Sequence, residues 1–203
     1  MELHIDGISE GQPVPEKFAF CAHLGMGDNV SPALSWSGVP DSARSIAVSC
    51  VDPDAPTDGT DVNVEGRTVP ASLPRADFAH WLLVDLPADT TGLAEGLSSS
   101  GVTPRGKPVD VAEAGGVRGA NDYTSWFEGD ANMGGTYGGY DGPCPPTNDE
   151  LVHHYIFSVY ALDVESTGLA PGFRLPDFHA AVDGHVLAAA RVTATYTLNP
   201  DLA

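Results

Sequence analysis

Basic residues are scarce in this chain. It has 9 Lys and Arg residues against 28 Asp and Glu residues, which gives a formal net charge of −19, and Lys17 and Lys107 are its only lysines. Proteins that bind DNA, RNA or anionic membrane surfaces need clusters of Lys and Arg to neutralise phosphate groups. We therefore expect no nucleic acid and no membrane insertion among the interactions of this protein.

Long apolar runs are also missing. No segment approaches 18 consecutive apolar residues, and the N-terminus, MELHIDGISEGQ, has neither the basic region nor the apolar stretch of a signal peptide. Neither export nor a membrane span is supported by these features. We expect a cytoplasmic protein.

Cysteine is rare, and its spacing is uninformative. The three cysteines, Cys21, Cys50 and Cys144, are odd in number and form no CxxC pair. This pattern argues against a disulfide framework and against a cysteine-rich zinc site. Cys50 lies in an apolar, strand-like run, so we expect it to be a small core residue.

The sequence consists mainly of short strand-like segments separated by turn residues. The chain has 23 Gly and 17 Pro, which separate the apolar segments KFAFCAH, ALSW, RSIAVSCV, AHWLLVDL, HYIFSVYALD and ARVTATYTL. In AHWLLVDL and HYIFSVYALD, apolar residues occupy both the odd and the even positions, so both faces of these strands should be covered. ARVTATYTL alternates between apolar and polar residues, so one of its faces should be exposed to water. We predict one domain, 1–203, that is mainly β: a two-layer antiparallel β-sandwich, Greek-key-like, with one or two short helices.

One of these helices is expected near the C-terminus. The segment 176–191, PDFHAAVDGHVLAAAR, begins with a proline suited to a first helical turn and repeats apolar residues at helical spacing. Two long connections rich in turn residues, 57–77 and 102–141, interrupt the strand pattern. Connections of this length in a compact domain are usually functional or mobile.

Carboxylates and histidines recur at the ends of the expected strands. Asp52 and Asp54 follow one strand, His80 begins another, and His153 and His154 begin a third. If the three strands are neighbours, these side chains meet at one end of the sheet. Prolines beside the two aspartates fix backbone angles, so Asp52 is well placed to hold a histidine or a ligand.

Several ordered motifs resemble a known family. They are DPDAP at 52–56, HWLLV at 80–84, and GPCPP at 142–146 followed by HHY at 153–155, with DNVSPALSW at 28–36 upstream and GHVL at 184–187 downstream. Together they resemble the bacterial and archaeal branch of the phosphatidylethanolamine-binding protein family, also called Raf kinase inhibitor protein-like. The likeness covers nearly the whole chain.

The resemblance implies a β-sandwich with an anion-binding pocket at one end. It implies a pocket for small phosphorylated or carboxylated ligands and allows inhibition of a protein partner, a kinase or a protease; by analogy a homodimer is also expected. The ligand-binding residues carried over are Asp52, Asp54, Phe78, His80, Gly142, Cys144, Pro146, His153 and Tyr155. The chain departs from the family's Gly-x-His-Arg pattern, because Leu151 and His154 replace the glycine and the arginine.

Simpler interpretations stand beside this one. Asp52 and Asp54 next to prolines are typical of a turn, and a lone histidine such as His80 is as often a hydrogen-bonded core residue as a ligand. We expect a non-enzymatic binding protein without cofactor or metal. The alternatives are a hydrolase that uses His80 or His153 as general base with Asp52 as its orienting partner, and, ranked last, a metal site.

The acidic composition leads to a first prediction. At about 1 M salt the Debye length falls to roughly 3 Å, so the mutual repulsion of the carboxylates is screened. We expect a salt-adapted, halophilic protein whose midpoint of thermal unfolding rises between low salt and molar KCl. A midpoint that does not change over this range would contradict the prediction.

Overall fold

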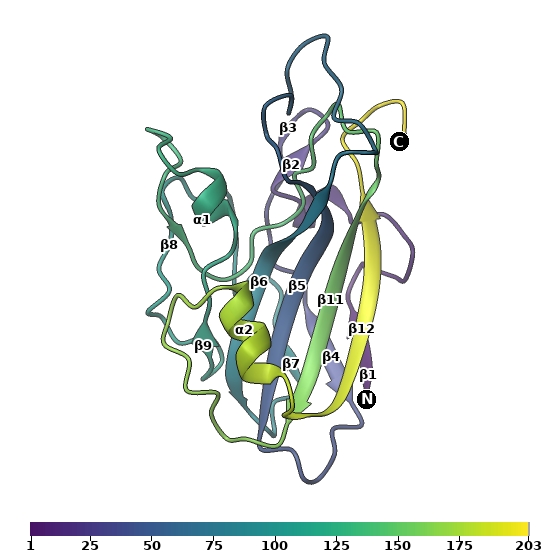
Figure 1. The fold of residues 1–203 in the computed structure, drawn as a ribbon. Coiled ribbons are helices and arrows are strands. Elements are labelled where there is room, and N and C mark those ends of the chain that lie inside the picture. Colours follow the sequence, from purple (N-terminus) through teal and green to yellow (C-terminus); the bar gives the residue numbers. More distant parts are fainter. Residues whose placement is uncertain (203) are drawn as a thin grey trace.

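A five-stranded antiparallel sheet forms the centre of the protein, which a computed structural model describes over residues 1–202 (Figure 1). Its strand order is β12-β11-β5-β6-β9. The bounds are β5 Ser45–Pro56, β6 Arg75–Pro87, β9 Val117–Arg118, β11 His153–Leu162 and β12 Val186–Tyr196. The segments predicted as RSIAVSCV, AHWLLVDL and HYIFSVYALD are therefore strands, and they are direct neighbours.

A smaller antiparallel sheet packs on one face of the large one. It has the order β1-β4-β7, with bounds β1 Glu2–Ile5, β4 Leu34–Ser37 and β7 Gly92–Leu93. In β4 the buried Leu34 and Trp36 alternate with exposed serines, because successive side chains of a strand point to opposite faces. Trp36 and Leu34 join Ile46, Val48, Trp81 and Phe157 in the main core between the sheets. The predicted mainly β, two-layer architecture is confirmed.

The opposite face of the large sheet is covered by helix α2, Leu175–Val182 (Figure 1). Phe178 and Val182 of the helix pack with Leu82 and Val84 of β6 in a second cluster of buried residues. Strands β6 and β11 each contribute buried residues to both clusters, so they are covered on both faces, as their apolar runs predict. The alternation in β12 is also confirmed, since Ala194 and Tyr196 are buried while the threonines between them are partly exposed.

The predicted helix 176–191 is wrong beyond its first two turns. Helix α2 ends at Val182, Gly184 adopts a φ of +83°, and β12 begins at Val186. Segment 186–191, VLAAAR, is helix-like in composition, yet it pairs with β11, where Ala190 lies opposite Val159. Sheet pairing overrides the local preference here, as tertiary context commonly does.

The remaining elements are short. They are η1 Glu16–Phe18, β2 Cys21–Ala22, β3 Gly25–Met26, β8 Gly106–Lys107, α1 Tyr123–Trp126 and β10 Thr136–Tyr137. The strand expected over KFAFCAH is mostly wrong, because only Cys21–Ala22 pairs, in a small hairpin with β3. No helix formed by residues 1–202 is long and apolar enough to cross a membrane.

Removal of the Phe178 ring tests the packing of α2 on the sheet. We expect Phe178→Ala to lower the free energy of unfolding by about 3–5 kcal/mol, because a fully buried aromatic ring leaves a cavity. Its neighbour His179 is exposed, so His179→Ala should change stability by no more than about 0.5 kcal/mol. Urea unfolding of both variants in molar KCl makes the comparison, and equal losses would contradict it.

Candidate functional site

Three neighbouring strands bring the predicted carboxylate and histidines to one end of the large sheet. Strand β5 pairs with β11 on one side and with β6 on the other. Asp52 lies near the end of β5, His80 lies on β6, and His153 is the first residue of β11. The expected convergence at one sheet end is confirmed.

A bulge directs the side chain of Asp52. The register of β5 against β6 shifts between Asp52 and Ala55, so Pro53 and Asp54 have no partner across the ladder. Proline has no N–H to donate, and it suits a bulged position. Asp52 Oδ1 accepts the N–H of Asp54 at 2.7 Å, which turns the carboxylate back over the strand end, where it is only 3% exposed.

Four side chains of alternating charge, Arg75, Asp149, His153 and Asp52, form a buried chain of contacts that we call the charged row. Asp52 Oδ2 lies 2.7 Å from Nδ1 of His153, and Nε2 of the same ring lies 3.2 Å from Asp149 Oδ2. Arg75 donates to both oxygens of Asp149, at 2.6 and 2.9 Å. The prediction that Asp52 can hold a histidine is met by His153.

Both ring nitrogens of His153 face carboxylate oxygens, so the imidazolium form satisfies them best. Burial disfavours that charge, but the hydrogen bonds and charges of Asp52 and Asp149 outweigh burial and raise the pKa of His153. Burial likewise opposes the ionised form of Asp149, yet Arg75, the Leu151 N–H and His153 together lower the pKa of that carboxyl. His153 therefore has no free N–H left for a ligand.

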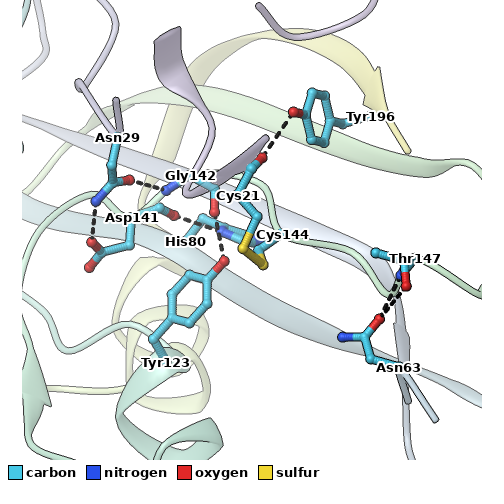
Figure 2. The surroundings of a disulfide bond; sticks show 10 residues. All are labelled: Cys21, Asn29, Asn63, His80, Tyr123, Asp141, Gly142, Cys144, Thr147 and Tyr196. Atoms are coloured by element: carbon cyan, nitrogen blue, oxygen red, sulfur yellow. Dashed lines mark hydrogen bonds between the residues drawn. A yellow bond between two sulfur atoms is a disulfide. The ribbon is translucent and has the colours of Figure 1, made fainter. Parts of the chain in front are cut away.

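His80 is held differently. Its Nδ1 lies 2.7 Å from the carbonyl oxygen of Asp141, which can only accept, so Nδ1 carries the proton (Figure 2). Burial lowers the pKa of His80, although the charges of Asp52, Asp122 and Asp141 oppose that shift. The neutral ring then presents the lone pair of Nε2, which has no partner within residues 1–202.

Tyr155 contributes the second free polar group. Its ring packs edge-on against His80, with 5.1 Å between centroids, and its side chain is 1% exposed. Burial, followed by the charge of Asp52, raises the pKa of Tyr155 well above its ordinary value, so the hydroxyl keeps its proton. No acceptor for this hydroxyl is found in the described part of the chain.

These groups line a cavity of about 370 Å³. Seven of the predicted site residues are part of its wall: Asp52, Phe78, His80, Cys144, Pro146, His153 and Tyr155. The rest of the wall is mainly apolar and was not predicted; it includes Phe20, Met26, Val62, Tyr123, Trp126, Phe127 and Met133. Most of these residues lie in the two long connections, 57–77 and 102–141. The unusual length of those connections was the sequence feature that could have indicated their part in the cavity wall.

Two predicted residues lie outside the cavity wall. Asp54 turns toward His154 instead, and its Oδ2 lies 2.9 Å from the backbone nitrogen and 2.8 Å from Nδ1 of that residue. Gly142 supports the wall from behind: its carbonyl accepts the hydroxyl proton of Tyr123, and a Cβ at this position would collide with the carbonyl of Phe18. His154, which replaces the family's arginine, thus contacts Asp54 and does not line the cavity.

A disulfide joins Cys21 to Cys144, and it corrects the sequence-based expectation (Figure 2). The bond ties the β2–β3 hairpin to the proline-rich loop, and both cysteines line the cavity. A pair separated by 123 residues leaves no local spacing to recognise, so only the tertiary structure reveals it. Cys50 is free and buried, as predicted.

A buried polar network fixes the start of the proline-rich loop. The carboxylate of Asp141 accepts from Asn29, Asn121 and Lys107, at 2.7, 2.8 and 2.6 Å. Asn29 also accepts the N–H of Gly142 (Figure 2). Because the carbonyl of the same Asp141 receives the proton of His80, this network also orients the imidazole. Asn29 belongs to the motif at 28–36, but the sequence patterns gave no role to it and did not single out Asn121, Lys107 or Asp141.

The ligands that a metal would need do not gather here. Within residues 1–202, no group of three or more His, Cys, Asp or Glu side chains is arranged to hold a metal ion. What the arrangement offers is one hydrogen-bond donor, the Tyr155 hydroxyl, and one acceptor, Nε2 of His80, at the bottom of an aromatic cavity.

The raised pKa of His153 predicts how its contribution to stability varies with pH. The contribution is complete below the ordinary imidazole pKa of 6.5 and is lost as pH rises through the higher folded value. We expect His153→Gln to cost about 3 kcal/mol at pH 6, since it leaves two buried carboxylates short of a cation, and clearly less at pH 9.

The matched control is His154→Gln, which removes the contact of a half-exposed imidazole with Asp54 and should cost less than about 1 kcal/mol. Urea unfolding of wild type and both variants at pH 6 and pH 9, in molar KCl, measures the difference. A cost of His153→Gln that is the same at both pH values would contradict the assignment of a charged His153.

Comparisons with known proteins agree with this geometry. The family model described as phosphatidylethanolamine-binding protein matches residues 4–197. The chain is 36% identical to the UPF0098 protein of Methanothermobacter thermautotrophicus over 84% of each chain, and 32% identical to YbhB of Escherichia coli over 97% of this chain and all of that one.

Solved structures show the same fold. Escherichia coli YbcL, whose structure is described as a new member of the mammalian PEBP family, superposes with a TM-score of 0.71 at 27% identity over 97% of each chain. The homologue CT736 of Chlamydia trachomatis superposes with a TM-score of 0.65 at 28% identity, over 96% of this chain and 95% of that one. The chain belongs to the phosphatidylethanolamine-binding protein family.

Proposed function

We propose that this protein is a non-enzymatic binding protein whose cavity takes a small ligand with a phosphate or carboxylate head and a compact apolar body. The observation that supports this most directly is the pair of free polar groups, the Tyr155 hydroxyl and His80 Nε2, on buried residues of a mainly apolar cavity. Sites for small molecules commonly combine a few polar groups with apolar walls.

The available donors suit an acidic head group. The Tyr155 hydroxyl is one. Cys144 also lines the cavity, and its backbone N–H, which has no acceptor among the residues described, is a second. Hydrogen bonds to an ionised acceptor are stronger than neutral ones. The acidic oxygens of a phosphate or carboxylate can accept from both.

The remaining wall suits an apolar body. Phe20, Tyr123 and Phe127 stack on one another, with ring centroids 4.6 and 5.7 Å apart between successive rings. Trp126, 47% exposed, and Met26, 56% exposed, extend this surface to the cavity opening. A cavity of about 370 Å³ lies at the small end of the range for small-molecule sites, so a compact ligand or a lipid head group fits better than a whole diacyl lipid.

The hydrolase alternative gains no support from the cavity wall. Its two cysteines are joined in the disulfide, and it contains no serine or threonine, so among residues 1–202 the wall offers no hydroxyl of serine or threonine and no free thiol as a nucleophile. His153, one of the two bases considered, has both nitrogens engaged. Inhibition of a kinase or protease and formation of a homodimer stay predictions from the family resemblance.

Removal of the Tyr155 hydroxyl tests the site directly. We expect Tyr155→Phe to weaken the binding of methyl phosphate, phosphoethanolamine or acetate by about ten- to a hundredfold, since a hydrogen bond to a charged group is worth about 1.5–3 kcal/mol. Thermal-shift titrations in molar KCl would measure the affinities from ligand-induced stabilisation.

Tyr160→Phe is the matched control. Tyr160 lies on the same strand but on the opposite face, where its ring packs against Phe178, so its hydroxyl is remote from the cavity. This variant should bind as wild type does. Failure of all three probes to stabilise wild type would contradict the proposed function, and steady conversion of a phosphate ester would support the hydrolase instead.

A further inference from the structure

Every charged side chain around the cavity floor already has a partner of opposite charge. Asp52 is paired with His153 at 2.7 Å, and Asp141 is paired with Lys107 at 2.6 Å. The third carboxylate near His80, Asp122, accepts from Arg174 at 2.8 Å. A ligand that arrives as an anion therefore meets no free cation in this part of the molecule.

The hydrogen-bonding groups of Asp52 and His80 that face the cavity are acceptors and not donors. Asp52 uses one oxygen to accept the N–H of Asp54 and the other to accept from His153, so its carboxylate acts as an acceptor only. His80 Nε2 is an acceptor as well, because Nδ1 donates to the carbonyl of Asp141. A fully deprotonated ligand oxygen next to Nε2 would place two lone pairs face to face, with no proton between them.

One added proton would reduce the negative charge of the ligand and would also lie between the two facing lone pairs. We propose that the cavity binds its acidic ligand together with one proton, which is shared between a ligand oxygen and Nε2 of His80. This inference rests on the proposed function. The proton comes from solvent: the ligand anion and H⁺ enter together, Nε2 and the ligand oxygen become the two ends of one hydrogen bond, and the negative charge added to the cavity is one unit smaller than that of the free ligand.

The surroundings of His80 favour such uptake once a ligand excludes water. The titratable and charged groups that face it are Asp52 from β5, Asp122 beside α1, Asp141 from the loop, His153 and Tyr155 from β11, Tyr123 from α1, and Lys107 through Asp141. Burial keeps the ring neutral in the free protein, while the three carboxylates lessen the cost of a proton there. A ligand anion adds a further negative charge in direct contact.

This site chemistry predicts a ligand preference. Phosphate monoesters have a second pKa near 6, so above about pH 7 they bind only by taking up a proton. Carboxylates must do the same. Their affinity should fall about tenfold for each pH unit between pH 7.5 and 9, a range in which the Tyr155 hydroxyl keeps its proton. His153 also loses its charge as pH rises, so His80→Gln, which retains His153, separates the two contributions.

Isothermal titration calorimetry of wild type with methyl phosphate and with acetate, at pH 8 and 1 M KCl, tests the proposal. Measurements in two buffers with different ionisation enthalpies give the number of protons taken up. We expect about one proton per ligand for wild type and also for Tyr155→Phe, which binds more weakly through the loss of an unrelated hydrogen bond. His80→Gln, whose amide can donate without titrating, should bind with almost no proton uptake and a flat pH profile.

The outcomes separate this inference from the function on which it rests. Binding by wild type with no proton uptake would overturn the shared proton and leave the binding function standing. Binding with one proton that persists in His80→Gln would also overturn the assignment to His80. No binding of either probe to wild type would overturn the proposed function and this inference together.

Discussion

The charged row of Arg75, Asp149, His153 and Asp52 is the constraint on which the end of the sheet depends. Each member is buried or nearly so, and an isolated buried charge costs several kcal/mol. Alternation of sign gives every interior member two opposite neighbours. Because the four residues come from the start of β6, the loop before β11, the start of β11 and the end of β5, their pairing fixes four chain segments relative to one another.

This row decides which side chains remain free to meet a ligand. It occupies both nitrogens of His153 and one oxygen of Asp52. These two residues therefore form part of the cavity floor but have few hydrogen-bonding atoms left for a ligand. His80 and Tyr155, on the flanking strands, keep one unpartnered polar atom each. The disulfide between Cys21 and Cys144 and the network around Asp141 hold the opposite wall, so both sides of the cavity are fixed by contacts away from the ligand space.

Much of the sheet was predictable because its strands carry their pattern locally. The runs around Trp81 and Phe157 are apolar at both parities, the run around Cys50 is apolar and strand-like, and the motifs beside them placed Asp52, His80 and His153 at one end. Segment 186–191 was misassigned because its alanines suit a helix, and only pairing with β11 decides its conformation. The disulfide, the charge partners Arg75 and Asp149, and the aromatic wall around Trp126 depend on contacts between distant segments, which leave no periodic signal.

The acidity of the chain is compatible with the proposed binding of an acidic ligand for an electrostatic reason. The two cations and two anions of the charged row cancel, and the carboxylates near His80 are paired as well, so the cavity floor is close to neutral although the chain carries −19. Repulsion of an anion then comes from distant surface carboxylates, which molar salt screens over about 3 Å. In the proposed complex, selection among ligands would then depend on contacts that salt hardly affects: hydrogen bonds to His80 and Tyr155 and the fit of an apolar body against the aromatic wall.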